Sequence, residues 1–206
     1  MFIPNSFQET DLTKLHDFMQ QQSFATLISQ GELDLTASHL PLLLDREAGP
    51  FGRLSGHIAR PNTQWQSADG TRVLVIFHGP HAYISPTWYE AQNVVPTWNY
   101  ATVHAYGVLK TIDDPARLYK IIRTTVDLYE SKMPQPWSML SPDAKFIEKL
   151  MCAIVGFDIQ IDRIEGKWKL NQHHPEERRD KVIRGLLATG DSESVQVAQL
   201  MAATKD

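Results

Sequence analysis

Residues 97–107, TWNYATVHAYG, alternate between two kinds of side chain, and this alternation is the strongest structural signal in the chain. The odd positions from Ala101 to Gly107 are small or apolar. The even positions are large or polar: Trp98, Tyr100, Thr102, His104 and Tyr106. Successive side chains of a β-strand point to opposite faces, so a period of two predicts a strand with one face packed inward. The opposite face would present a row of aromatic rings.

Other segments show strand character between turn signals. Residues 23–29 are rich in β-branched and aromatic side chains, and residues 51–62 alternate Leu54, Gly56 and Ile58 with polar residues. A further alternating strand is predicted after residue 153. These segments together predict a sheet of several strands.

Proline and glycine predict where these strands end. HGPH at 78–81 is interpreted as a polar turn between two apolar strands, and a second turn is expected near Glu165-Gly166. Pro41 has no amide hydrogen to donate to a central strand. We therefore expect the strand around Pro41 to lie at an edge or at a bulge.

Helices are predicted by apolar residues at intervals of three and four, first in residues 11–22. Two later helices are expected to begin where a cap residue precedes proline, at Asp114 and at Ser141. Residues 173–206 contain two short helical patterns that are joined at Thr189-Gly190. Most helices follow the strands and do not alternate with them.

This order favours an α+β, mainly β protein, in which six or seven antiparallel strands form a small barrel with peripheral helices. We expect residues 1–172 to form the barrel domain with embedded helices, and residues 173–206 to form a C-terminal helical tail.

Composition excludes some classes of function. The net charge of -4 gives no basic footprint for nucleic acid. The single cysteine, Cys152, cannot form an internal disulfide, which favours a cytoplasmic setting, and its apolar neighbours predict that it is buried. No signal-peptide pattern and no apolar run of membrane-spanning length is visible.

Histidine spacing does not predict a metal site. His78 and His81 are the best-spaced pair of the eight histidines, but no third or fourth ligand accompanies them. A single histidine would suffice as a haem ligand. We therefore predict no metal-ion site and leave haem open.

Polar, aromatic and basic residues gather at the predicted strand ends. They are His57, Arg60, Asn62, Ser85, Trp88, Tyr89, Thr97, Trp98, Asn99, Tyr100, Lys169, Asn171 and Gln172. A planar cofactor with a phosphate tail needs such a set, because rings cover its faces, amides meet its edge and cations bind its phosphate. The alternative is that the rings pack in the core or at an interface, and that Arg60 forms a surface ion pair.

Five linked motifs occur in one order over most of the chain, and together they resemble the PaiB family of FMN-binding negative transcriptional regulators. The motifs are SHLPLLLD, LSGHIARPN, GPHAYISPTWY, VVPTWNYATVHAYG and KWKLNQ. The resemblance implies a split-barrel fold similar to pyridoxamine phosphate oxidases and flavin reductases, usually as a homodimer with flavin at the subunit seam. It adds His39 and Leu40 to the predicted FMN-binding residues, and it implies that residues 1–172 are the FMN-binding domain.

Three functions remain open at this stage. The first is an FMN-binding regulator of the PaiB type, and the second is a flavin-dependent oxidoreductase that acts on a small molecule. The third is a haem-binding split barrel. Direct DNA binding is disfavoured, because the last predicted helix, SESVQVAQLMA, has no Arg or Lys to meet phosphates. No catalytic acid or base is assigned.

Overall fold

A computed structural model describes residues 1–31 and 33–204. Glu32, in the turn expected before the second strand, and residues 205–206 of the expected tail lie outside the described residues. The chain divides into two compact units, and each of them is discontinuous in sequence. Unit 1 contains Met1–Asp11, His78–Val103 and Glu165–Asp206, and unit 2 contains Leu12–Phe77 and His104–Ile164.

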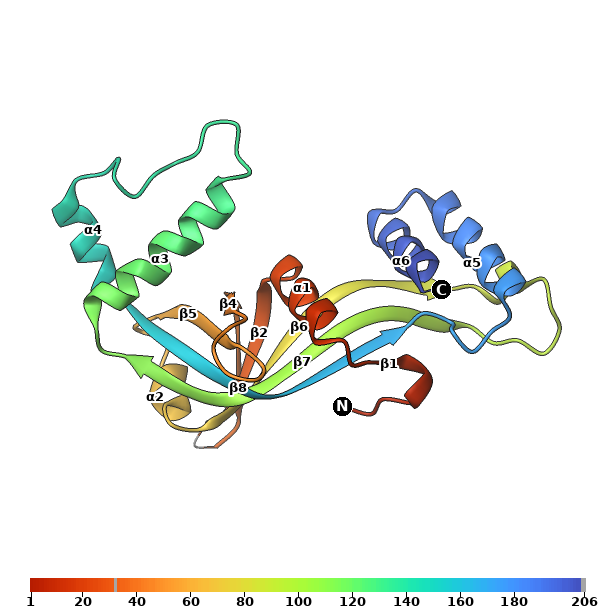
Figure 1. The fold of residues 1–206 in the computed structure, drawn as a ribbon, viewed down its shortest axis with the longest axis horizontal. Coiled ribbons are helices and arrows are strands. Elements are labelled where there is room, and N and C mark those ends of the chain that lie inside the picture. Colours follow the sequence, from red (N-terminus) through yellow and green to blue (C-terminus); the bar gives the residue numbers. More distant parts are fainter. Residues whose placement is uncertain (32, 205–206) are drawn as a thin grey trace. The chain divides into compact units, whose positions relative to one another are not determined.

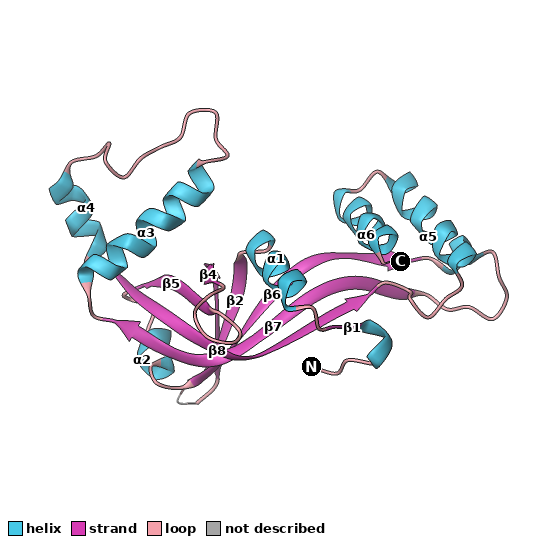
Figure 2. Ribbon diagram, in the orientation of Figure 1, coloured by secondary structure: helices cyan, strands magenta, loops and turns pink. Residues whose placement is uncertain are grey.

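The strands form one sheet in the order β3-β2-β6-β7-β8-β5-β4, and β1 pairs with β8 (Figures 1 and 2). Three long strands contribute residues to both units: β6 (Arg72–Ile84), β7 (Thr97–Ile112) and β8 (Ile154–Lys169). The shorter strands are β1 (Gln8–Glu9), β2 (Phe24–Gln30), β3 (Leu35–Pro41), β4 (Leu43–Asp45) and β5 (Arg53–Ala59). Every pair with a defined register is antiparallel.

This sheet confirms the α+β, mainly β prediction. Within the described residues it has eight strands, whereas the sequence predicted six or seven. The prediction was low because β1 and β4 are only two and three residues long and leave no periodic signal. Pro41 ends the edge strand β3, as expected. The odd positions of β7 are buried from residue 99 to 109, as the alternation predicts.

Two predicted turns are wrong. HGPH lies inside β6, and Glu165-Gly166 lies inside β8. The buried positions of β6 change phase within HGPH, from odd numbers up to Phe77 to even numbers from Pro80 onward. The local pattern breaks there because the strand passes from one compact unit to the other, and the chain does not reverse.

Helices α1 (Leu12–Gln21), α2 (Gln64–Ala68), α3 (Pro115–Glu130) and α4 (Ala144–Met151) belong to unit 2. Asp114 caps α3 as predicted, because its Oδ1 accepts a hydrogen bond from the Ala116 amide at 2.9 Å. The predicted cap of α4 is wrong: Asp143, not Ser141, accepts from the Lys145 amide at 2.9 Å. Asp143 lies one residue after Pro142, directly before the first helical residue, so its carboxylate reaches the free amides.

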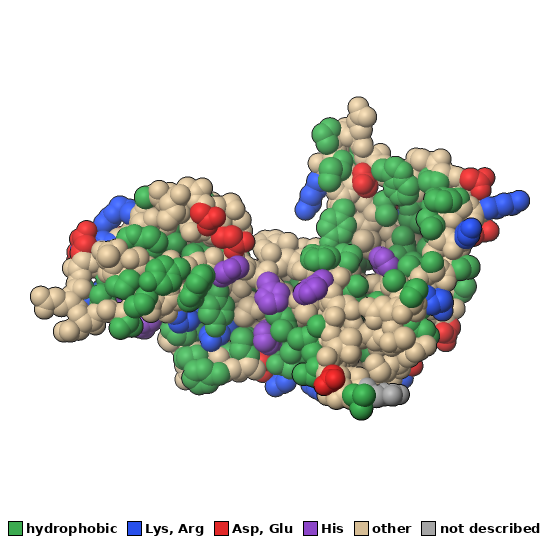
Figure 3. All heavy atoms as spheres, turned by 180° about the vertical axis from the view of Figure 1, so that it is seen from behind, with side chains coloured by type: hydrophobic (Ala, Val, Ile, Leu, Met, Phe, Trp, Pro, Cys, Tyr) green, Lys and Arg blue, Asp and Glu red, His purple; other side chains and the backbone are tan. Residues whose placement is uncertain are grey.

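Unit 1 contains the 3₁₀-helices η1 (Asn5–Phe7) and η2 (Pro86–Tyr89), and the helices α5 (Glu176–Thr189) and α6 (Ser192–Ala203). The chain turns between α5 and α6 at Gly190, whose φ of 70° suits glycine. The core of unit 1 consists of Ala82, Ile84, Tyr89, Leu170, Val182, Leu186, Val197, Ala198 and Met201. Figure 3 shows that apolar side chains also reach the surface.

Unit 2 has its own core between its strands and helices. Its largest fully buried side chains include Met19, Leu27, Leu54, Phe77, Phe157 and Ile159. Cys152 is exposed, so the prediction that it is buried is wrong. Among the described residues, no helix is both long and apolar enough to cross a membrane, and no three potential metal ligands cluster.

Candidate functional site

Unit 1 contains a cleft of about 480 Å³, which is within the size range of small-molecule sites. We call it the cationic cleft. Its lining comes from η1, η2, the loop before β7, the end of β8 and the start of α5. The lining residues are Phe7, Tyr89, Asn93, Val94, Val95, Pro96, Thr97, Lys169, His173, His174 and Arg178. No carboxylate is among the described residues that form this lining.

Lys169 lies at the end of β8, where its ammonium group is fixed by the start of β7. Its Nζ donates to the carbonyl oxygen of Trp98 at 2.6 Å and to the hydroxyl of Thr97. Burial, and secondarily Lys167, lowers the pKa of Lys169. An ammonium group has three N–H bonds. These two acceptors occupy two of them, so a third can donate to a ligand.

Tyr89 closes the cleft from η2, and its ring and hydroxyl are both held in place. Asn171 Nδ2 donates to the Tyr89 hydroxyl oxygen at 3.0 Å. Burial raises the pKa of Tyr89, so its hydroxyl stays protonated near neutral pH and can donate a hydrogen bond. The Arg178 guanidinium lies 5.8 Å from the centre of the Tyr89 ring.

Two adjacent histidines complete the lining. The rings of His173 and His174 are 4.1 Å apart, and His174 Nδ1 lies 3.1 Å from Arg178 Nη1. Burial lowers the pKa of both histidines, and the positive charge of Lys169 contributes in each case. The two rings are therefore mainly neutral near pH 7, and a bound anion would favour their protonation.

The histidines and Arg178 were missed by the sequence reasoning, which assigned them to the C-terminal helical tail at residues 173–206. Their signal is positional: three imidazole or guanidinium groups follow the end of β8 within nine residues of Lys169. Several cations after a strand end indicate an anion site only when another loop is known to cover them. Here that loop is the one before β7, which the sequence alone does not place beside these cations. The cleft combines these cations with apolar residues at 94–96, which suits an anionic group attached to an apolar body.

Three of the predicted residues line the cationic cleft: Tyr89, Thr97 and Lys169. A fourth, Asn171, donates a hydrogen bond to the Tyr89 hydroxyl. Asn171 is fully buried, and its Oδ1 has no hydrogen-bond partner in the described part of the chain. Its φ of 63° is a left-handed conformation that asparagine tolerates better than most residues. Asn171 thus shapes the turn that follows β8.

Four other predicted residues of unit 1 bind its own backbone or core. Ser85 caps η2 by accepting from the Thr87 amide at 3.3 Å, and Asn99 is buried with Nδ2 3.4 Å from Met201 Sδ. Gln172 donates to the Trp168 carbonyl at 2.6 Å and accepts from the Leu170 amide. Trp88 packs against the core of unit 1.

Trp98 and Tyr100 lie on the outward-facing side of β7. The indole of Trp98 is 54% exposed and forms an edge-to-face pair with Tyr83 at 5.9 Å. The Tyr100 ring is half-buried, and its centre is 5.3 Å from Lys167 Nζ. Neither ring is among those lining the cationic cleft.

The remaining predicted residues, His39, Leu40, His57, Arg60 and Asn62, belong to unit 2. Arg60 donates to the carbonyl oxygens of Cys152 and Ile154 at 2.7 and 2.9 Å, so it secures the end of α4 to the start of β8. Asn62 donates to the Ser38 hydroxyl at 2.9 Å within a side-chain network.

His39 and Leu40 lie on β3 and have local partners on β2, whereas His57 lies on β5. His39 Nδ1 is 3.1 Å from the Thr26 hydroxyl, and Leu40 pairs with Ala25 across the sheet. His57 Nδ1 is buried without a hydrogen-bond partner among the described residues, and burial lowers the pKa of this imidazole. The structure therefore assigns the predicted set to two units.

Comparison with known proteins identifies the family. Residues 1–163 match a family model described as "Putative FMN-binding domain". The "Protease synthase and sporulation protein PAI 2" of Bacillus subtilis is 35% identical over 204 residues, which cover 98% of this chain and 96% of that protein. This chain belongs to the PaiB family. The cations of the cleft, at residues 169–178, lie beyond the range that the family model matches.

Two solved structures establish the fold of this PaiB protein. The flavocytochrome Anf3 from Azotobacter vinelandii superposes with a TM-score of 0.62 at 17% identity, covering 84% of this chain and 75% of that chain. The FAD and haem binding protein from Mycobacterium smegmatis gives 0.57 at 13% identity, covering 89% and 80%. At such identities the likeness concerns the fold alone, and it confirms the split barrel.

Proposed function

We propose that this PaiB protein binds FMN and that the cationic cleft holds the phosphate end of the flavin. The carrying observation is that Lys169 and Arg178 line the cleft while no described lining residue is a carboxylate. Phosphate oxygens accept strong charge-assisted hydrogen bonds from ammonium and guanidinium groups. The free N–H of Lys169 and the hydroxyl of Tyr89 are the donors that this chain offers.

The neighbouring apolar residues Val94, Val95 and Pro96 would contact the apolar part of the ligand. When bound, a flavin supplies electron or hydride transfer. The residues of this chain would bind and orient it, because Lys169 and Tyr89 are themselves held by Trp98 and Asn171. Family membership supports FMN as the flavin.

We further propose a homodimer whose interface includes the outward face of β6 and β7 in unit 1. Trp98 and Tyr83 are 54% and 48% exposed, and His81 lies 6.1 Å from the Trp98 ring. Aromatic rings are enriched in the buried centres of protein interfaces. A contiguous group of exposed rings therefore supports burial against a second copy.

For regulation we propose an indirect, cytoplasmic role rather than direct DNA reading. The basic residues of α5 are largely used within unit 1: Arg179 donates to the Met201 carbonyl at 3.1 Å, and Lys181 pairs with Glu90 at 2.9 Å. The next helix, α6, carries no Lys or Arg. This distribution of charge gives little support for phosphate contacts along a DNA groove.

The test compares FMN with riboflavin, which lacks the phosphate, by quenching of flavin fluorescence on titration into the full chain. We expect Lys169→Met to weaken FMN binding about tenfold or more and to leave riboflavin binding unchanged, as loss of one charged hydrogen bond predicts. Lys149→Met, on the exposed face of α4, is the matched control. Equal effects on both ligands would overturn the placement of the phosphate.

The absorption spectrum of the freshly purified protein separates the other functions. Flavin bands support the proposal, whereas a Soret band would favour haem. Anaerobic addition of NADH then tests turnover, because catalytic bleaching of the bound flavin would identify an oxidoreductase. A spectrum without flavin bands, together with no FMN binding on titration, would overturn the proposed function.

A further inference from the structure

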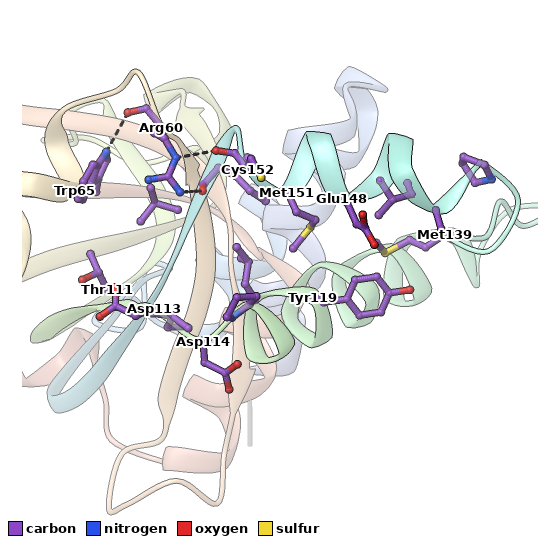
Figure 4. Close-up of a pocket in the computed structure, with 18 of the residues that line it drawn as sticks. Arg60, Trp65, Thr111, Asp113, Asp114, Tyr119, Met139, Glu148, Met151 and Cys152 are labelled. Atoms are coloured by element: carbon purple, nitrogen blue, oxygen red, sulfur yellow. Dashed lines mark hydrogen bonds between the residues drawn. The ribbon is translucent and has the colours of Figure 1, made fainter.

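Unit 2 contains a second and larger cavity, of about 840 Å³, which we call the α3–α4 cavity (Figure 4). It is lined by α3, the loop and helix that follow it, the end of β7 and the start of β8. Arg60 is the only residue that its described lining shares with the set predicted to bind flavin. The cavity is therefore a separate candidate for ligand binding.

Apolar side chains make up most of its walls. The buried ones are Leu118, Met139, Ile147 and Val155, with Ile112 and Met151 beside them half-buried. Figure 4 shows Tyr119 on α3 and Met139 in the loop that precedes α4. Two rings, those of Tyr119 and Trp65, are among the lining residues. Such walls favour an apolar ligand body.

The charges of this cavity are opposite to those of the cationic cleft. Its lining includes the carboxylates of Asp113, Asp114 and Glu148, against one guanidinium, that of Arg60. Arg60 is directed to the backbone carbonyls of Cys152 and Ile154. Asp114 caps α3, where the positive end of the helix dipole offsets its charge. Asp113 and Glu148 therefore leave the lining with an excess of negative charge, which disfavours phosphate and favours a cation.

We propose that the α3–α4 cavity binds a small organic amine, with an apolar body between α3 and α4 and its ammonium group near Glu148. The ring of Tyr119, which Figure 4 shows at the same end of the cavity as Glu148, adds a surface on which a cation is stabilised. This site is independent of the flavin proposal, since it lies in the other compact unit and has the opposite charge.

The test uses three ligands with one apolar body: 4-phenylbutylamine, 4-phenylbutanol and 4-phenylbutyrate. Binding to the full chain is followed by calorimetry and by NMR of ¹³C-methyl methionine, because Met139 and Met151 line the cavity. We expect the amine to bind about tenfold or more tightly than the alcohol, and the acid to bind weakest. The methyl signals of Met139 and Met151 should shift on binding of the amine.

Variants separate charge from volume. Glu148→Gln should reduce the affinity for the amine about tenfold and leave the alcohol unchanged, as loss of one ion pair predicts. Ala144→Phe adds a ring to the lining and should weaken all three ligands. Glu47→Gln, an exposed carboxylate elsewhere in unit 2, is the matched control, and circular dichroism checks that each variant is folded.

Several results would overturn the inference. They are equal affinities for the amine and the acid, no binding of the amine at millimolar concentration, or an unchanged affinity in Glu148→Gln. Leu140 lines the cavity, and Phe146 and Leu150 lie next to lining residues in the sequence. All three side chains are exposed, and a second copy of the chain is the competing occupant that would cover them. If the apparent affinity for the amine falls as the protein concentration rises, a second copy of the chain competes with the amine for this surface. That result would also overturn the inference.

Discussion

Asn171 donates from Nδ2 to the phenolic oxygen of Tyr89 across 3.0 Å, and both side chains are buried. The bond joins the turn after β8 to η2, two segments that are 82 positions apart. Because Tyr89 both lines the cationic cleft and belongs to the core of unit 1, this bond couples the shape of the cleft to the stability of the unit.

Tyr89→Phe removes the acceptor and leaves Asn171 Nδ2 buried without its partner. We expect the free energy of unfolding to fall by about 1–3 kcal/mol, the cost of one unsatisfied buried polar group. Urea unfolding followed by circular dichroism measures the change. Tyr83→Phe, which removes a hydroxyl from a half-exposed ring, is the control and should change stability little. Equal stability of Tyr89→Phe and the unmodified chain would contradict the role of this bond.

Two glycines at the C-terminal end of the chain are required for different reasons. A Cβ on Gly185 would lie 2.5 Å from the Trp88 ring, whereas Gly190 has open space around it but a φ of 70°. Gly185→Ala should destabilise by about 1–3 kcal/mol through overpacking, despite the better helix propensity of alanine. Gly190→Ala should cost about 1–2 kcal/mol through backbone strain.

Fluorescence distinguishes these two mechanisms. Gly185→Ala should change the tryptophan emission of the folded protein, because it displaces Trp88, whereas Gly190→Ala should leave the emission unchanged. Thermal unfolding of both variants gives the stability change. A Gly185→Ala variant that is more stable than the unmodified chain would show that Trp88 moves without cost.

Much of the sheet could be predicted from periodicity, because many of its strands bury one face and expose the other. The segment around β7 shows this best, since its odd positions are buried as expected. Two of the three long strands that pass between units, β6 and β8, were wrongly divided by predicted turns. Pro80 and Gly166 are typical turn residues, but they lie inside long strands near the boundary between the two units, and only the tertiary context distinguishes the two cases.

The sequence predicted which types of residue form the candidate site, but not which individual residues come together in it. Lys169 and Thr97 belong together because one ammonium group binds the start of β7, a contact between residues 72 positions apart. Arg60 had the same apparent role in the sequence, yet its donors point to two backbone carbonyls. Spacing along the chain cannot show that Lys169 lies in the cleft with Tyr89 and Arg178, whereas Arg60 lies in the other compact unit.

Stability should fall as the solution is acidified through the histidine range. Burial lowers the folded-state pKa of His57, and of His173 and His174, below the ordinary value of 6.5. The unfolded chain then binds more protons than the folded chain, so the free energy of unfolding decreases between about pH 7.5 and pH 5.5. Urea unfolding at several pH values measures the slope. His57→Gln should flatten it, and an identical slope in the variant would exclude a contribution from His57.

The outward-facing rings of β7 provide the test of the proposed dimer. Replacing Trp98 and Tyr100 together by alanine removes two large side chains from the outward face and should weaken association, because aromatic anchors carry much of the binding energy of an interface. Flavin retention should fall with it if the two subunits share the flavin site. Size-exclusion elution and the flavin content of the purified protein measure both effects.

Phe24→Ala, which truncates a 66% exposed ring in unit 2, is the control for the loss of an exposed aromatic side chain. It should leave elution and flavin content unchanged. If the double variant elutes like the unmodified protein and contains as much flavin, the rings of β7 do not form the seam. Lys169, Arg178 and Tyr89 all come from a single chain, so one subunit can supply the whole cationic cleft. A variant that dissociates but keeps its flavin would therefore place the whole flavin site within one subunit.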